Sequence, residues 1–167
     1  MLNVDHKGLS IENLNEFNKE HSPTIPKGFP KERLPKDLCQ HTLNKLLMCL
    51  MGAQANTCGD RNKKFYMCKR ERDAQLFTLV KDWEIETFND EGKFKKLIQN
   101  DKLKGEEQVL DAKKKYIREL SESREELVKQ FESTPSSIAN KHKRWRMAAD
   151  VEQLQWRVKY LNEQLNY

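Results

Sequence analysis

Four cysteines are the residues of this chain whose type and spacing could do chemistry. Cys39 and Cys49 enclose nine residues, and Cys58 and Cys68 enclose nine more. A zinc site usually has ligand pairs two to four residues apart, a thioredoxin-like site requires C-x-x-C, and a copper carrier requires adjacent soft ligands. The sequence has none of these spacings. The pattern therefore favours structural disulfides over a metal or redox site.

The geometry of the α-helix predicts how the cysteines pair. Ten helical steps turn a residue by about 1000°, so the two cysteines of one helix lie within roughly 80° of one face and about 15 Å apart. Two such helices packed antiparallel bring Cys39 to Cys68 and Cys49 to Cys58. A bridge between Cys39 and Cys49 is excluded, because bonded cysteines have Cα atoms within about 7 Å of each other.

The alternative to disulfides is a set of four unrelated buried thiols in a cytosolic helical protein, which the repeated spacing argues against. Disulfides do not persist in a reducing cytosol. Residues 1–17 have no apolar signal core and no arginine, unlike a secretory signal or a matrix presequence. We therefore expect the mitochondrial intermembrane space, reached without an ordinary cleaved presequence.

Composition predicts an all-α, elongated protein. Charged residues make up 34% of the 167, and only six glycines and five prolines are present. Runs rich in Val, Ile and Thr, which are typical of strands, are missing. No stretch approaches the 18 apolar residues of a transmembrane helix. The net charge of +5 is too small an excess to indicate nucleic-acid binding.

Three regions follow from the pattern along the chain. Residues 1–35 form an N-terminal arm, with one short helix suggested by Ile11, Leu14 and Phe17 and an extended stretch that holds four prolines. Residues 36–91 form the twin CX9C helical hairpin, whose second helix continues past the last cysteine. Residues 92–167 form a helical, coiled-coil-like extension.

Two helices are expected in the C-terminal extension. The first, at about 106–132, has apolar residues near a heptad register that Lys113 and Arg124 interrupt. The second begins at Thr134 as N-cap with Pro135 in its first turn and ends near 165. The apolar positions of the first helix are Leu110, Ile117, Leu120, Leu127 and Phe131. Those of the second helix are Met147, Val151, Leu154, Val158, Leu161 and Leu165. The second series indicates a coiled-coil seam or a helix docked on a partner. We expect partners, and no core of the chain's own, to bury these helices.

Three other features can be interpreted either as binding sites or as residues used only for packing or solvation. His41 lies near Cys39, but no second histidine is close, so packing or interface use is favoured over metal binding. The basic stretch 141–146 could bind cardiolipin or RNA, although a solvated or acid-facing surface is favoured. Trp156 and Tyr160 indicate core or interface packing. No catalytic motif, cofactor site or metal site is predicted, so the chain is not expected to be an enzyme.

The first cysteine pair carries a family resemblance. The pattern C-x-H-x-L-x-K-L-L-x-C is formed by Cys39, His41, Leu43, Lys45, Leu46, Leu47 and Cys49. It resembles the twin CX9C (CHCH) proteins, and within them the family of beta-subcomplex subunit seven of mitochondrial complex I. The resemblance extends over residues 34–90, and the tail beyond residue 95 is longer than that family implies.

The resemblance implies a route of import and a function. Twin CX9C proteins enter through the disulfide-relay machinery, and Leu46 and Phe65, each three residues before a cysteine, are the candidate docking residues. The implied function is a non-catalytic accessory subunit of complex I on the intermembrane-space face of its membrane arm, peripheral to the inner membrane. Its partners would be neighbouring subunits, and its role would be assembly and stability.

Other functions stay open for this cysteine class. The chain could belong to cytochrome oxidase or to the bc1 complex, or act as a soluble twin CX9C assembly factor or metallochaperone. It could also be an RNA-associated subunit of the mitochondrial ribosome.

Overall fold

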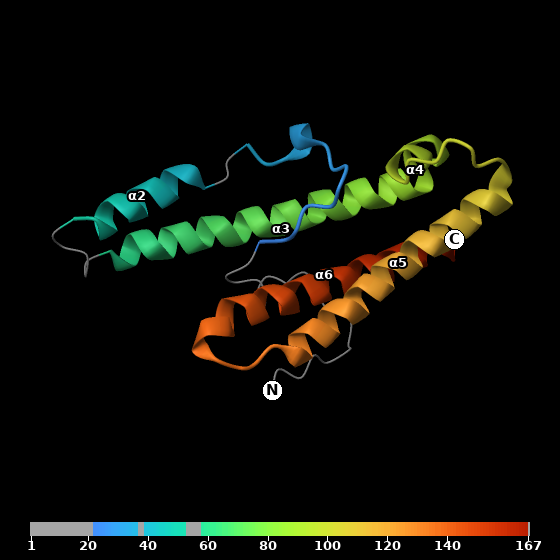
Figure 1. The fold of residues 1–167 in the computed structure, drawn as a ribbon. Helices are drawn as coiled ribbons and strands as arrows, with labels where there is room; N and C mark the ends of the chain where they lie inside the picture. The colour runs from blue at the N-terminus through green and yellow to red at the C-terminus, as the bar shows by residue number, and fades with distance from the viewer. Residues whose placement is uncertain (1–21, 37–38, 53–57, 167) are drawn as a thin grey trace.

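A computed structural model describes residues 22–36, 39–52 and 58–166 (Figure 1). Helices make up most of these residues, and the part of the chain described contains no strand, so the predicted all-α fold is confirmed. The α-helices are α2 (Gln40–Leu50), α3 (Gly59–Asn89), α4 (Glu91–Leu97), α5 (Gly105–Ser133) and α6 (Lys141–Leu165), with short 3-10 turns η1 (Lys31–Arg33) and η3 (Ile138–Asn140). The helix expected around Ile11, Leu14 and Phe17 lies outside the described residues.

Helices α2 and α3 lie antiparallel and form a hairpin, as the cysteine spacing predicts (Figure 1). The name cysteine hairpin is used below for residues 39–52 and 58–72. Helix α3 has 31 residues and continues well past Cys68, also as expected. Beyond the hairpin its buried positions, among them Val80, Trp83 and Glu84, face the rest of the molecule. One uninterrupted helix therefore connects the hairpin to the body of the protein.

The proline-rich arm, residues 22–36, has no α-helix, as predicted, and it passes across α3 (Figure 1). It is extended except for a turn at 27–28 and the 3-10 turn η1. Gly28 makes a turn with φ +91°, a conformation that residues with a Cβ rarely adopt. The turn brings the Phe29 ring onto Trp83 of α3, edge to face at 5.3 Å. On the other side, the Gln153 side chain binds both the N–H and the carbonyl of Thr24. The arm thus joins α3 to α6.

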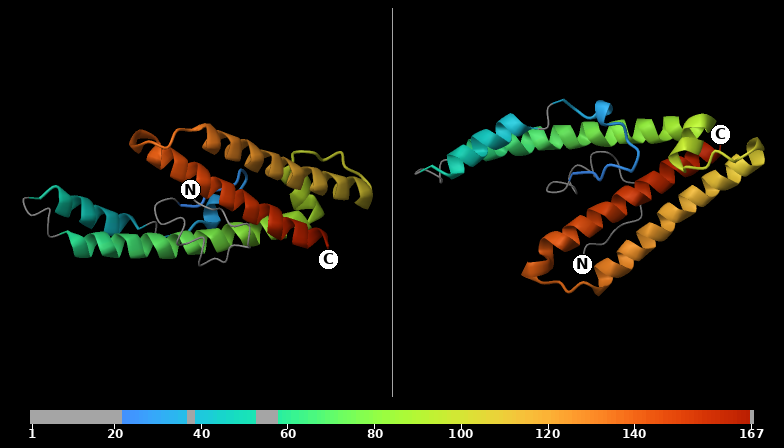
Figure 2. Two further views of the ribbon diagram at one scale, coloured as in Figure 1. Left: turned by 90° about the horizontal axis from the view of Figure 1, so that it is seen from below. Right: turned by 45° about the horizontal axis from the view of Figure 1, so that its top comes forward.

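Helices α5 and α6 form a second antiparallel hairpin that packs on the C-terminal part of α3 (Figure 2). The core at this junction consists of Phe88, Phe94, Val109, Ile117, Tyr160 and Leu161. Our expectation that these helices lack a core of their own is therefore wrong. Each helix contributes only one or two of these residues, and the core forms only when the four helices α3, α4, α5 and α6 converge.

Two details of the C-terminal helices differ from the sequence-based expectation. Thr134 is the C-cap of α5 and not the N-cap of α6, which begins at Lys141. The residues between them turn through η3, where the Ser137 side chain accepts a hydrogen bond from the Asn140 N–H. Leu110 is 40% exposed, and Val109 takes the buried position instead.

Lys113, which interrupts the heptad register, has a defined place in the structure. Its ammonium nitrogen lies 5.0 Å from the centroid of the Phe88 ring and 5.8 Å from that of Phe94. Burial lowers the pKa of this lysine. A cation over aromatic faces is attracted to their negative π-density, so the lysine covers the edge of the core without breaking it.

Candidate functional site: the cysteine hairpin and the adjoining groove

Two disulfides join the helices of the cysteine hairpin. Cys39 is bonded to Cys68 and Cys49 to Cys58, with Cα atoms 6.0 and 5.9 Å apart. This is the pairing that helix geometry predicts, and no cysteine is free. The bridges lie at the two ends of α2, so they fix both the separation and the register of the helices. A helix pair this short buries little apolar surface, and the cross-links supply the stability that a larger core would provide.

The residues that the sequence singles out around the cysteines have different environments. Leu46 is buried between the helices, with 6% of its surface exposed. Phe65 is half-buried and its ring packs edge to face on Tyr66 at 5.3 Å. His41 is exposed on α2. The role of Leu46 and Phe65 in import docking stays a prediction, and Leu46 would have to act before the hairpin closes.

A set of exposed apolar side chains on this hairpin is not among the residues that the sequence predicted to be functional. Met48 is 72% exposed and Met51 is 82% exposed. Four further large apolar residues of the hairpin are exposed by 41–54%, and they are Leu47, Leu50, Tyr66 and Met67. The signal was present in the run Leu46–Met51, which contains more apolar residues than one buried helix face can use.

A buried polar cluster joins α3 to the C-terminal hairpin. The Glu84 carboxylate, which is completely buried, accepts hydrogen bonds from the Arg157 guanidinium and from the Tyr160 hydroxyl at 2.8 Å. Tyr116 lies at the edge of the cluster, and its hydroxyl accepts from Arg157. Burial raises the pKa of Tyr116 to about 12, with a further contribution from the Glu84 charge. All these groups are paired, so the cluster orders the fold and offers no unpaired base.

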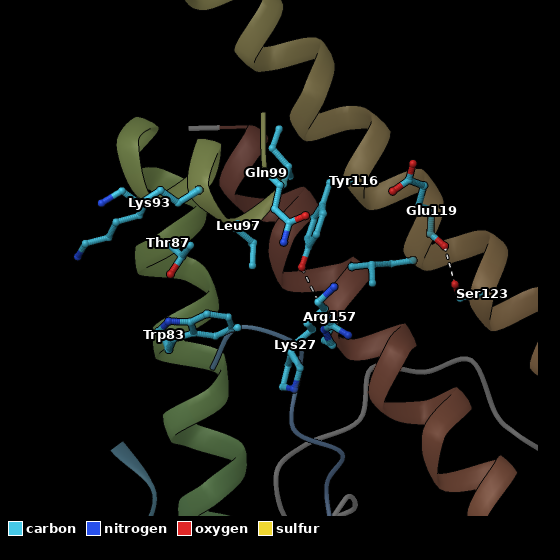
Figure 3. Close-up of a pocket in the computed structure, with 15 residues that line it drawn as sticks. Lys27, Trp83, Thr87, Lys93, Leu97, Gln99, Tyr116, Glu119, Ser123 and Arg157 are labelled. Carbon is cyan, nitrogen blue, oxygen red and sulfur yellow. Dashed lines mark hydrogen bonds between the residues drawn. The ribbon is translucent and has the colours of Figure 1, made fainter. Parts of the chain in front are cut away.

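A groove of about 920 Å³ opens beside this cluster, between α3, α4, α5 and the arm (Figure 3). Trp83, Leu97 and Tyr116 form part of its wall, and Lys27 lies at its edge. Glu119 is the one acidic residue among those that line it. The groove brings together no thiol, no paired carboxylates and no histidine, so its lining offers no recognisable set of catalytic groups.

The basic stretch 141–146 serves the fold. Arg144 donates to the carbonyls of Phe131 and Thr134 at the end of α5, and its guanidinium lies 4.1 Å from the centre of the Phe131 ring. Lys141 lies over the Trp145 ring at 4.3 Å. Arg146 donates to the carbonyl of Ser22 in the arm. These contacts favour neither the cardiolipin nor the RNA interpretation of the stretch.

Trp156 and Tyr160 pack in the interior, as expected. The Trp156 ring meets Phe77 of α3 edge to face at 5.1 Å, and only 2% of Tyr160 is exposed. None of the described helices is both long enough and apolar enough to cross a membrane. Among the described residues, no group of His, Cys, Asp or Glu has the arrangement of a metal site.

Comparison with known proteins gives no match to a family model, a curated protein or a solved structure.

Proposed function

We propose that this protein is a non-catalytic accessory subunit of mitochondrial complex I, located on the intermembrane-space face of the membrane arm and contributing to assembly and stability. The two disulfides of the cysteine hairpin are the observation that carries the proposal. Such bridges require an oxidising compartment. The resemblance of residues 39–49 to the beta-subcomplex subunit seven family supplies the choice of complex I.

The shape of the chain suits a structural role. Helix α3 has 31 residues, which corresponds to a rod of about 46 Å. The cysteine hairpin occupies one end of this rod, and the α5–α6 hairpin packs near the other (Figure 1). A rod with a packed unit at one end and a cross-linked unit at the other can hold two neighbouring subunits at a fixed distance.

A soluble twin CX9C assembly factor is the second candidate, and one observation favours it. The C-terminal hairpin buries a core against α3, so the chain does not depend on partners to cover these helices. A protein that folds by itself can exist free or bind a complex transiently. An accessory subunit of cytochrome oxidase or the bc1 complex would share the same compartment and chemistry.

Native electrophoresis of mitochondria distinguishes these functions. The full chain carries a small C-terminal tag at its natural level of expression, and each band is analysed by mass spectrometry. We expect most of the protein to migrate with complex I and its assembly intermediates. Stable migration with another respiratory complex, or as a free small protein, would contradict the choice of complex I.

Thiol alkylation before any reduction tests the compartment separately. We expect the protein isolated from its own cells to remain unmodified at all four cysteines. Alkylation of all four would reject the intermembrane-space assignment together with the disulfide hairpin. The protein alkylated after reduction serves as the control for reagent access.

A further inference from the structure

Four of the six exposed apolar residues of the cysteine hairpin lie on one side of it, and Met48 and Met67 are not counted among them. With 100° per residue, Leu47, Leu50 and Met51 lie within about 100° of arc on α2. The same geometry places Tyr66 of the antiparallel α3 on the side of the hairpin to which this arc points. The name apolar face is used below for these four residues. Each of them is more than 40% exposed, and Met51 is 82% exposed.

The cysteine hairpin also has an excess of basic residues, two of which, Lys69 and Arg72, form ion pairs with Asp73 just beyond it. Its residues include seven of the 31 lysines and arginines but only two of the 26 acidic residues, Asp60 and Glu71. The other 24 basic and 24 acidic residues of the chain cancel. Lys63 lies three residues before Tyr66 and Arg70 lies four residues after it, and both are exposed. Residues at these spacings are neighbours on a helix surface, so the two basic side chains flank the apolar face on α3.

The shape of this surface distinguishes between two classes of partner. An amphipathic helix of another protein is usually held in a hydrophobic groove. The cysteine hairpin lines neither the groove between α3, α4, α5 and the arm nor the hollow beside Phe131 and Trp145. It projects beyond the α5–α6 hairpin in both views of Figure 2. A projecting apolar face with flanking cations matches the boundary between the headgroups and acyl chains of an anionic bilayer.

We infer that the cysteine hairpin docks on the surface of a membrane rich in anionic phospholipid. The leucine and methionine side chains of the apolar face enter the headgroup boundary, and Lys63 and Arg70 contact the phosphates. The disulfides matter here because they hold the two halves of the face together on separate helices. This inference goes beyond the proposed function, and its test in vitro does not depend on which complex contains the protein.

Co-sedimentation with lipid vesicles tests the inference on the oxidised full-length protein. One set of vesicles is pure phosphatidylcholine, and the other contains a third phosphatidylglycerol. We expect binding to the anionic vesicles only. Binding should fall steeply when added salt shortens the screening length from about 10 Å to about 3 Å. Equal binding to both vesicle types, or binding to neither, would overturn the inference.

Two variants with matched controls locate the binding surface. Replacing Lys63 and Arg70 by Gln should lower partitioning to anionic vesicles roughly thirtyfold, from about one kcal/mol for each basic residue at such a surface. The control variant replaces Lys114 and Lys129 of α5, which are also exposed, and should bind within about threefold of the original chain. Equal losses in both variants would overturn the inference, because binding would then follow total charge alone.

The apolar face is tested in the same way. Leu47→Gln with Met51→Gln should lower partitioning at least tenfold, because the side chains that would enter the bilayer become polar. The control carries Ile25→Gln and Ile138→Gln, two exposed apolar residues outside the hairpin, and should bind like the original chain. Circular dichroism and non-reducing electrophoresis confirm that each variant is folded and bridged. A folded apolar-face variant that binds normally would overturn the inference.

Discussion

Arg157 of α6 and Glu84 of α3 form a buried ion pair that connects residues 73 positions apart in the sequence. The Arg157 Nε lies 3.0 Å from both carboxylate oxygens of Glu84, and its Nη2 lies 2.6 Å from one of them. Although burial alone lowers the pKa of Arg157, its hydrogen bonds and charge interaction with Glu84 outweigh this effect and raise it. Arg157 therefore stays charged, and the pair fixes how the C-terminal hairpin sits on α3.

Removing one member of this pair should destabilise the fold strongly. Arg157→Met leaves the buried Glu84 carboxylate without its main partner in the core. We expect the free energy of unfolding to fall by about 3–5 kcal/mol. Urea unfolding followed by circular dichroism at neutral pH measures the change. Arg118→Met, at an exposed position of α5, is the control and should change stability by less than about 0.5 kcal/mol.

The double variant Arg157→Met with Glu84→Leu tests whether the loss comes from the unpaired charge. With both charges removed, we expect the variant to be more stable than Arg157→Met alone, because no buried carboxylate remains uncompensated. If the double variant loses the sum of what Arg157→Met and Glu84→Leu lose singly, the stability of this junction does not depend on the ion pair.

Glu152 of α6 predicts a pH dependence of stability. The residue is 5% exposed, and its Oε2 has no hydrogen-bond partner among the described residues. Burial raises the pKa of its carboxyl to about 7 in the folded protein, against 4.5 ordinarily. Below the ordinary value both folded and unfolded states are protonated. As the pH rises from 4.5 to about 7, stability is lost, because only the unfolded state releases the proton freely.

The variant Glu152→Gln should remove this dependence. We expect it to be more stable than the original chain by about 2 kcal/mol at pH 8 and by much less at pH 5. Urea unfolding at the two pH values measures the difference. Asp82→Asn, at an exposed position of α3, serves as the control. A Glu152→Gln variant with the same advantage at both pH values would contradict the prediction.

Gln99 offers a stabilising substitution at the end of α4. Its φ is +54°, and it follows the C-cap residue Ile98. The Asn100 N–H donates to the Lys95 carbonyl and the Gln99 N–H to the Lys96 carbonyl, which is the Schellman pattern that favours glycine. Gln99→Gly should raise the free energy of unfolding by about 1 kcal/mol. Asn100→Gly, at the next position, should not stabilise the chain, and a stabilised Asn100→Gly would contradict this explanation.

The two disulfides should contribute to stability unequally. Cys39–Cys68 spans 29 positions and Cys49–Cys58 spans nine, so the outer bridge restricts the unfolded chain more. We expect replacement of the outer pair by serine to cost about 3.5 kcal/mol and replacement of the inner pair about 2.5 kcal/mol. Hydrogen exchange at the backbone amides of α2, recorded at rising temperature, measures the stability loss of each variant. A larger loss for the inner pair would show that native contacts dominate the effect.

The sequence alone predicted the cysteine hairpin, its pairing and the extended arm. These features depend on local rules: a fixed rotation per residue decides which cysteines can meet, and proline restricts its own backbone and that of its neighbour. The same kind of rule predicted that α3 continues past Cys68 and that Trp156 and Tyr160 pack in a core or an interface.

Only the tertiary structure decided how the C-terminal helices are buried. The Glu84–Arg157 pair, the contact of Gln153 with Thr24 and the position of Lys113 over Phe88 all join residues far apart in sequence. A charged residue within a heptad appears as an interruption when only one helix is considered. Once α5 and α6 pack on α3, such a charge gains a partner, as Arg157 does, or an aromatic face, as Lys113 does, because burial makes such pairing energetically necessary.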